Sequence, residues 1–178
     1  MKKYSDKSVV FIIPEKNFHD HEFKIPKEIL EINGYRTFVA SESLNFATGH
    51  FGLKVKPEIY FYNLHPENFS AIILIGGHGT RTLWNNLILH KILQKFYKQK
   101  KILAAICSGV GILASAELLK GKKATCFVND IEFIKSSGAI YTGNLIETDN
   151  NIVTAAGPHT SEVFGQEIAN LLKKGKNL

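Results

Sequence analysis

One of the two cysteines in this chain has the surroundings of a reactive thiol. Cys107 follows the apolar run 102–106, and small residues come directly after it, beginning with Ser108 and Gly109. This order predicts a buried strand that turns sharply into a helix, the arrangement that many hydrolases use for a nucleophilic serine. Backbone N–H groups at a helix N-terminus favour an anion and lower the pKa of a thiol. The alternative is an unreactive cysteine of the core, because free cysteines are among the most buried residues.

The elements that would position this cysteine alternate between strand and helix along the whole chain. Apolar runs predict strands at 8–13, 35–40, 71–75, 102–106, 124–128, 139–149 and 151–156, with short strands and turns over 46–64. Amphipathic stretches predict helices at 20–33, 85–98, 130–136 and 159–174, and a further helix from the cysteine to Leu119. Strands that are buried on both faces and alternate with helices predict a mostly parallel sheet covered on both sides. The expected fold class is therefore a single doubly wound α/β domain over residues 1–178.

Composition excludes several other classes of protein. The chain has 178 residues with 44% hydrophobic and 21% charged content, as expected for one globular domain. Its two cysteines, Cys107 and Cys126, lack the spacing of a zinc site or a disulfide framework, and Cys126 is expected in the core. No signal peptide or membrane-spanning run is apparent, so a cytoplasmic location is expected.

The net charge of +6 raises the question of nucleic-acid binding. The lysines cluster at 91–101, 120–123 and 173–176, without interleaved aromatic residues or a helix-turn-helix pattern. A solvated, lysine-rich surface is the preferred interpretation, and neither nucleic acid nor membrane is expected as a partner.

Several loops are expected to meet at one edge of the sheet, because ligands of such sheets bind at the carboxyl ends of the strands. These loops are 14–22, 76–79, 107–108 and 156–159. Each of three carries a histidine, and His19, His78 and His159 are therefore candidates to line a pocket or to act as a base. No phosphate-binding loop and no metal-ligand motif is present, so no cofactor or metal is expected.

Taken in order along the chain, these segments resemble the ThiJ/PfpI superfamily. The resemblance covers nearly the whole chain and is carried by Leu74-Ile75-Gly76-Gly77, Ala105-Ile106-Cys107-Ser108-Gly109, 118–125 and Val153-Thr154-Ala155-Ala156-Gly157-Pro158. It implies a flavodoxin-like sandwich with a nucleophile elbow, assembled as a homodimer or a higher homo-oligomer. The activities it implies are glyoxalase or deglycase chemistry, peptidase action, isonitrile hydration, chaperone function and redox sensing.

The resemblance also implies roles for individual residues. The family's nucleophile corresponds to Cys107. Its glutamate lies four residues before a proline, so that Pro26 selects Glu22; Glu15 is the alternative but lacks this spacing. The family's oxyanion donors, two backbone N–H groups, correspond to Gly77 and Ser108.

Two departures argue against a peptidase. The peptidase-like branch has a histidine base directly after the cysteine, where this chain has Ser108. That branch also draws an acid from a neighbouring subunit, where this chain has Arg81. The sequence is closer to branches that rely on the cysteine and the glutamate alone.

A Cys–Glu pair predicts chemistry on small reactive carbonyls such as methylglyoxal. A buried carboxyl with a raised pKa can donate a hydrogen bond to the thiolate and then move protons. Cys107 would add to the aldehyde as a hemithioacetal, Glu22 would carry the proton between carbons, and the two N–H groups would hold the oxyanion. The structural alternative for Glu22 is a helix-start acid that the helix dipole stabilises.

Other functions remain open alongside this enzyme. Cys107 could sense or resist oxidative stress as a sulfinic acid that Glu22 stabilises. A residual hydrolase, or a chaperone with a large apolar patch, would be further possibilities. His19 lies three residues before Glu22 and could replace the missing base, or be an exposed helix-start residue. Trp84 is expected in helix packing or in a subunit interface.

Overall fold

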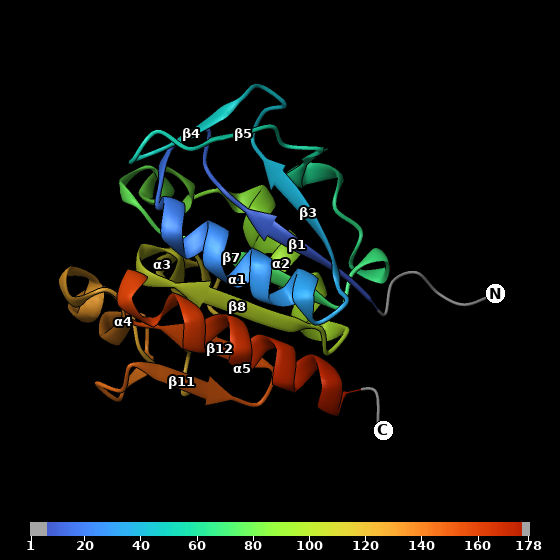
Figure 1. Cartoon of the computed structure of the whole chain (residues 1–178). Coiled ribbons are helices and arrows are strands. Elements are labelled where there is room, and N and C mark those ends of the chain that lie inside the picture. The colour runs from blue at the N-terminus through green and yellow to red at the C-terminus, as the bar shows by residue number, and fades with distance from the viewer. Residues whose placement is uncertain (1–6, 176–178) are drawn as a thin grey trace.

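The computed structural model describes residues 7–175, and its centre is one seven-stranded sheet (Figure 1). The strands are β1 (Ser8–Ile12), β3 (Arg36–Ser41), β6 (Ile59–Tyr60), β7 (Ala71–Leu74), β8 (Ile102–Ile106), β11 (Ile146–Asp149) and β12 (Ile152–Ala155). Their order across the sheet is β11-β12-β8-β7-β1-β3-β6. All neighbours are parallel except β11 and β12. The predicted mostly parallel α/β sheet is thereby confirmed.

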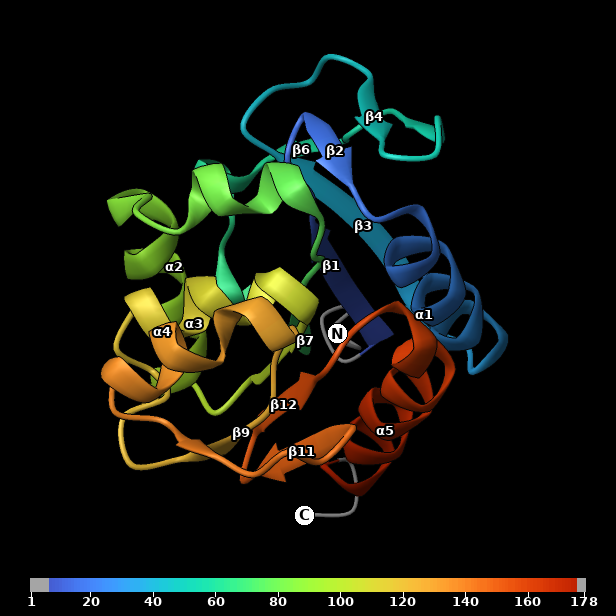
Figure 2. The same ribbon diagram turned by 90° about the vertical axis from the view of Figure 1, so that its left-hand side faces the viewer.

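Helices cover both faces of this sheet (Figure 2). α1 (Asp20–Ile32) and α5 (Ser161–Lys174) pack together on one face, and α2 (Leu87–Lys98), α3 (Val110–Ser115) and α4 (Ile131–Ser136) lie on the other. Successive strand residues feed opposite cores: Ile72 and Leu74 of β7 join one buried cluster, whereas Ile73 joins the other. Since both faces are covered, the strands are continuous apolar runs, as the prediction required.

Two small sheets flank the large one. β2 (Lys16–Phe18), β4 (Ala47–Gly49) and β5 (Lys54–Val55) form a three-stranded sheet, and β9 (Lys123–Ala124) pairs with β10 (Ile140–Tyr141). β2 was not predicted, because it is three residues long and largely exposed, and it contains Asn17 at φ 58°. Short 3-10 turns connect the elements at Phe61–Asn63, Pro66–Asn68, His78–Leu83, Cys107–Gly109, Val128–Asp130 and Pro158–Thr160.

Three predicted elements differ in the structure. The strand expected over 139–149 is divided into β10 and β11, because the chain turns between them, with Gly143 at φ 73°. The helix expected to reach Leu119 ends at Ser115, since Glu117 adopts φ 60°, a left-handed conformation that a helix cannot continue through. The strand expected over 124–128 is only β9, which ends at Ala124: the N–H of Thr125 donates to the side-chain hydroxyl of Thr154 instead of a strand carbonyl, and a 3-10 turn begins at Val128.

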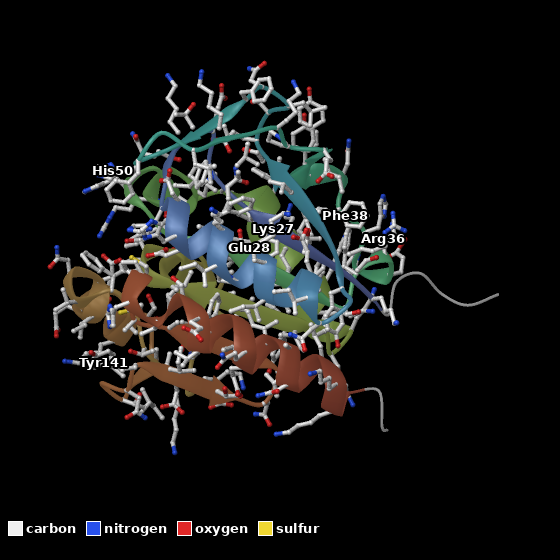
Figure 3. The ribbon with its side chains drawn as sticks, in the orientation of Figure 1. Lys27, Glu28, Arg36, Phe38, His50 and Tyr141 are labelled. Atoms are coloured by element: carbon white, nitrogen blue, oxygen red, sulfur yellow. The ribbon has the colours of Figure 1, made fainter. Side chains whose placement is uncertain are left out.

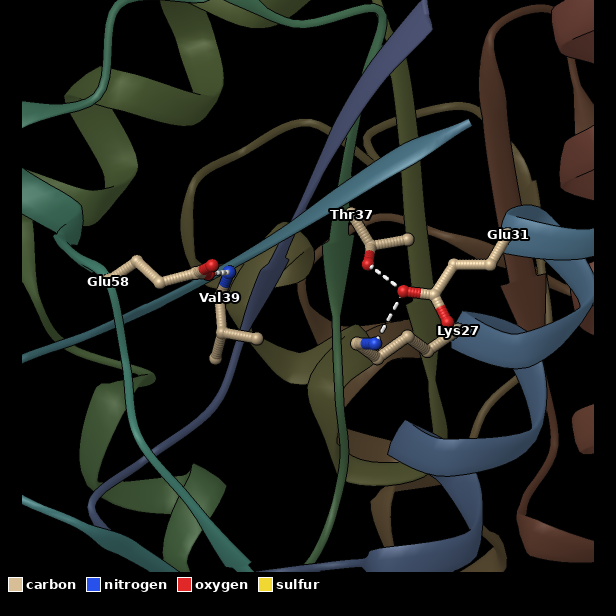
Figure 4. Close-up of polar contacts among 5 residues, drawn as sticks. All are labelled: Lys27, Glu31, Thr37, Val39 and Glu58. Atoms are coloured by element: carbon tan, nitrogen blue, oxygen red, sulfur yellow. Dashed lines mark hydrogen bonds and ion pairs between the residues drawn. The ribbon is translucent and has the colours of Figure 1, made fainter. Parts of the chain in front are cut away.

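Side-chain hydrogen bonds fasten α1 and the edge of the sheet (Figure 4). Glu31 on α1 accepts from Lys27 on the same helix and, at 2.6 Å, from the Thr37 hydroxyl on β3. The Glu58 carboxylate accepts from the backbone N–H of Val39 at 2.7 Å. This part of β3 lies outside the pairing with β6, which involves Ala40 and Ser41. The contacts of Glu31 hold the far end of the helix whose first turn carries Glu22, and the contact of Glu58 holds the edge of the sheet.

None of the helices described between residues 7 and 175 is long and apolar enough to cross a membrane.

Candidate active site

The turn after β8 is a strained nucleophile elbow. Cys107 has φ 57°, a left-handed conformation that is uncommon for a residue with a side chain and is found where structure or function requires it. A 3-10 turn, Cys107–Gly109, then leads into α3. Gly109 is needed there, since a Cβ on it would lie 2.6 Å from the carbonyl oxygen of Leu74. The predicted strand–cysteine–helix turn is therefore present.

The side chain of Trp84 forms a hydrogen bond with this elbow. The indole N–H of Trp84 donates to the carbonyl oxygen of Ser108 at 2.8 Å, and its ring stacks on Phe133 with centroids 4.5 Å apart. A Cβ on Gly111 would overlap the Trp84 ring, so this glycine makes room for the indole.

Glu22 lies beside the cysteine and is completely buried. Its Oε2 accepts the backbone N–H of Gly76 at 3.0 Å. A Cβ on Gly76 would lie 2.5 Å from this Oε2 and 2.6 Å from the Cβ of Cys107. The carboxyl and the cysteine therefore both pack against Gly76. Oε1 is buried and has no hydrogen-bond donor within the described chain. The structure therefore brings Cys107 and Glu22 together, and it leaves one oxygen free to carry a proton.

Burial dominates the electrostatics of this pair. It raises the pKa of Glu22 to about 7, although hydrogen bonds with Cys107 and Gly76 oppose the shift. Burial and the negative charge of Glu22 raise the pKa of Cys107 to about 12, whereas the N–H and hydroxyl of Ser108 lower it. The lowered thiol pKa expected from the helix N-terminus is wrong, because the thiol is buried beside a carboxylate and α3 has only six residues.

Because the two groups are in contact, they titrate as a pair. Between about pH 7 and 12 the pair holds one proton, on Glu22 or on Cys107. When Glu22 carries it, the carboxyl has no charge and can donate a hydrogen bond to sulfur, and Cys107 is a thiolate. This is the state in which the cysteine is a nucleophile.

The two residues predicted to supply oxyanion donors, Gly77 and Ser108, both lie in the lining of the cleft that contains Cys107. Gly77 has φ 113°, and a Cβ on it would overlap the backbone at Asn17 and His19, so only glycine fits. Its N–H donates to no acceptor among residues 7–175. The N–H of Ser108 is directed at the Cys107 sulfur. The hydroxyl of Ser108 acts on the same sulfur, a role that the sequence did not suggest.

A small cleft of about 260 Å³ opens above the sulfur. Its lining comprises His19, His50, Phe51, Gly77, His78, Arg81, Cys107, Ser108, Phe127 and Pro158. Of the three histidines predicted, His19 and His78 belong to it. His159 is exposed and is not part of the lining, which its neighbour Pro158 provides. Glu15, the alternative to Glu22, instead accepts from Ser43 outside the cleft.

His19 is held between the first helix and the cleft. Its backbone N–H donates to the carbonyl of Gly76 at 2.9 Å, and its ring lies edge-on to Phe51 at 5.4 Å. Nδ1 is buried and has no partner in the described region. Burial and nearby His21 lower the pKa of His19, and the opposing effect of Asp20 does not offset them. A neutral imidazole thus borders the thiol, in the state that can accept a proton.

The turn between β4 and β5 supplies a wall of the cleft that sequence reasoning missed. His50 and Phe51 of this turn belong to the lining. His50 lies at the end of the molecule where α1 begins, far from Arg36 and Phe38 (Figure 3). Buried Asp20 fastens the turn: its carboxylate accepts the N–H groups of Phe51 at 2.9 Å and Leu53 at 2.8 Å. The only local signal was the pair of glycines around His50 and Phe51.

Between residues 7 and 175, no three histidine, cysteine, aspartate or glutamate side chains are arranged to hold a metal ion.

The fold and this site define a class: α/β sandwiches with a cysteine at the strand–helix elbow and a buried acid from the first helix. The chain belongs to the DJ-1/PfpI family, whose model matches residues 7–171. The resemblance to the ThiJ/PfpI superfamily is thereby confirmed.

Relatives and solved structures agree with this assignment. An uncharacterized protein of Methanocaldococcus jannaschii is 36% identical over 93% of this chain and 82% of its own length. A deglycase of Thermococcus kodakarensis is 30% identical over 92% of this chain and 99% of its own. A ThiJ/PfpI domain protein from Brachyspira murdochii superposes with a TM-score of 0.93 at 29% identity, over 96% of this chain and 98% of that one.

Proposed function

We propose that this protein is a cofactor-independent cysteine enzyme that acts on small reactive carbonyls, in the manner of a glyoxalase or deglycase. The observation that carries the proposal is the pairing of strained Cys107 with fully buried Glu22 beneath a small cleft. Relatives named as deglycases, at 28–30% identity over 92% of this chain, support it at the level of the family.

For methylglyoxal, the first step forms a covalent adduct. The Cys107 thiolate attacks the aldehyde carbon, and the carbonyl π electrons move to oxygen. The N–H groups of Gly77 and Ser108 stabilise the developing oxyanion, which takes up a proton to give a hemithioacetal. The proton that Cys107 gave up resides on Glu22 and is available for this transfer.

The second step moves a proton between carbons. The Glu22 carboxylate removes the proton from C1, which gives an enediolate; the proton of the C1 hydroxyl passes to the C2 oxygen, and Glu22 returns the carbon-bound proton to C2. The result is a thioester of lactate on Cys107, and water hydrolyses it to lactate and the free thiol. Methylglyoxal and water are thus converted into lactic acid with no external oxidant, reductant or thiol.

His19 is proposed as the base for the hydrolytic step. The ring belongs to the cleft lining and its lowered pKa favours the neutral imidazole, so it suits a group that accepts a proton from water. Ser108 cannot replace it, because a hydroxyl is a poor base near neutral pH.

The test is lactate formation from methylglyoxal without glutathione. We expect turnover by the wild type and none above background for Cys107→Ala, with Cys126→Ala as the matched control that keeps activity. Absence of turnover on every aldehyde and glycated amine in a panel, by protein that is folded, would contradict the proposal.

A redox role is the second candidate. Glu22 in its protonated form can donate a hydrogen bond to a sulfinate on Cys107, and Ser108 provides further donors. Titration with peroxide followed by intact mass distinguishes the two functions. A stable two-oxygen adduct on Cys107, together with no carbonyl turnover, would favour the sensor.

A peptidase receives no support from the site. The residue after the cysteine is Ser108, and Arg81 pairs with Asp130 of its own chain.

A further inference from the structure

The cleft above Cys107 is lined by hydrogen-bond donors and by no carboxylate side chain. Its polar side chains, apart from Cys107 and Ser108, are His19, His50, His78 and Arg81. They come from three segments that are distant in sequence: the start of α1, the β4–β5 turn and the loop after β7. Three of the chain's seven histidines thus converge on a lining of ten residues. Imidazole donates a hydrogen bond when neutral and two when protonated, and arginine is always charged.

Contacts hold the Arg81 guanidinium in place but leave most of its N–H donors unpaired within the described chain. One nitrogen, Nη2, donates to Oδ1 of buried Asp130, and the guanidinium lies 4.9 Å from the centre of the Trp84 ring. No other acceptor in the described chain takes its remaining N–H groups, and the side chain is 38% exposed. A guanidinium held on one side in this way presents its free donors in a planar fork, which suits a carboxylate or a phosphate.

The acids nearest to the cleft do not compete for these donors. Both oxygens of Asp20 accept backbone N–H groups of the β4–β5 turn. Asp130 is buried behind Arg81, and Glu22 lies below the floor, outside the lining. An anion that enters the cleft therefore meets donors and no exposed carboxylate.

We propose that the cleft selects small carbonyl compounds that carry an anionic group, with the carbonyl at Cys107 and the carboxylate or phosphate at Arg81, His50 and His78. The carbonyl half of this statement rests on the proposed function, whereas the anion half does not. Drug-sized ligands occupy pockets of roughly 300–1,000 Å³. A cleft of about 260 Å³ therefore fits a small metabolite.

The first test compares two alkylating agents of nearly equal size, anionic iodoacetate and neutral iodoacetamide. With either agent the sulfur–carbon bond forms, the carbon–iodine bond breaks and iodide leaves. We expect the iodoacetate-to-iodoacetamide rate ratio for Cys107 to exceed that for free cysteine by about tenfold at low salt. Added salt should reduce the excess. A wild-type ratio equal to that of free cysteine would overturn the proposal, whatever the enzyme's turnover.

Variants locate the anion site. Arg81→Gln with Asp130→Asn removes the cation without leaving a buried charge, and should return the ratio to that of free cysteine. His50→Gln with His78→Gln changes two exposed side chains and should reduce the ratio several-fold. His65→Gln, an exposed histidine outside the cleft, is the matched control. If both cleft variants kept the wild-type ratio, the proposal would be overturned.

Competition and turnover complete the test. Inorganic phosphate and acetate should each slow alkylation by iodoacetamide, and the stronger competitor identifies the preferred group; protection by neither would overturn the proposal. As substrate, 4,5-dioxopentanoate should exceed its neutral methyl ester in kcat/KM by about tenfold. If neither compound turns over while the iodoacetate preference persists, the proposed function fails and the anion site stands.

Discussion

The two cysteines of this chain are alike in burial but differ in their surroundings. Cys107 is 6% exposed and Cys126 is 2% exposed. Burial comes first among the causes that raise the pKa of each thiol to about 12, and a nearby acid adds to it, Glu22 for Cys107 and Asp130 for Cys126. By burial and pKa alone, both thiols would be inert.

The two cysteines differ in the acid that lies near each thiol. Glu22 is fully buried, has a pKa of about 7 and keeps a free oxygen, so it can take the proton of Cys107. Asp130 is bound by Arg81, and the Cys126 thiol instead donates to the carbonyl of Phe127 at 3.3 Å. Only Cys107 has a strained backbone and an open cleft. A buried thiol can therefore be reactive when a neighbouring group is able to accept its proton.

The largest effect should come from the nucleophile. Cys107→Ser should lower kcat for lactate formation at least a thousandfold, because hydroxyl does not ionise near neutral pH. Cys126→Ser should retain kcat within about twofold, since that thiol is outside the cleft. Steady-state kinetics on both variants, with circular dichroism to establish folding, makes the comparison. Equal losses of kcat in the two variants would contradict the assignment of Cys107 as the nucleophile.

The next effect should come from the proton acceptor. Glu22→Gln keeps the shape but can neither remove nor return a proton, and should lower kcat by roughly 10²–10⁴. The same substitution should stabilise the fold at higher pH. Since burial raises the pKa of Glu22, its contribution to stability is present below its unfolded value and is lost as pH rises toward 7.

The stability change can be measured directly. Between pH 4.5 and 7.5, wild-type protein should lose on the order of 3 kcal/mol relative to Glu22→Gln. Urea unfolding of both proteins at several pH values provides the measurement. Parallel stability curves would show that Glu22 is not a buried carboxyl with a raised pKa.

A smaller effect should come from the residue that positions the cleft wall. Asp20→Asn has one acceptor oxygen where the carboxylate offers two, so one of the N–H groups of Phe51 and Leu53 loses its partner. KM should rise several-fold, and kcat should change less, because Cys107 and Glu22 are unaffected. A fall in kcat with unchanged KM would place Asp20 in the chemistry instead.

The smallest effect should come from the hydrogen bond between Trp84 and the elbow. Trp84→Phe removes the indole N–H that binds the Ser108 carbonyl and should cost about 1 kcal/mol in the free energy of unfolding. Phe133→Leu, which removes the stacked ring but keeps that hydrogen bond, is the matched control. Thermal unfolding that shows no loss for Trp84→Phe would mean that the hydrogen bond is immaterial to stability.

Sequence reasoning reached those parts of the site that depend on local order. The run into Cys107 predicted the elbow, and the resemblance to the ThiJ/PfpI superfamily, through the distance to Pro26, indicated Glu22 in preference to Glu15. It could not find the β4–β5 turn, because its attachment to Asp20 joins residues 31 and 33 positions apart. It also missed β2, which is too short for a hydrophobic period, and the role of Gly111, which depends on distant Trp84. A single domain, a homo-oligomer and a cytoplasmic location stay predictions.

The most direct test of the shared proton is the pH dependence of Cys107 alkylation by iodoacetamide in wild type and Glu22→Gln. We expect the wild-type rate to begin rising as the pair loses its first proton near pH 7, because the proton that remains is shared with Glu22, and we expect Glu22→Gln to lack this step. Superimposable profiles for the two proteins would contradict this expectation, because the thiol would then ionise independently of Glu22.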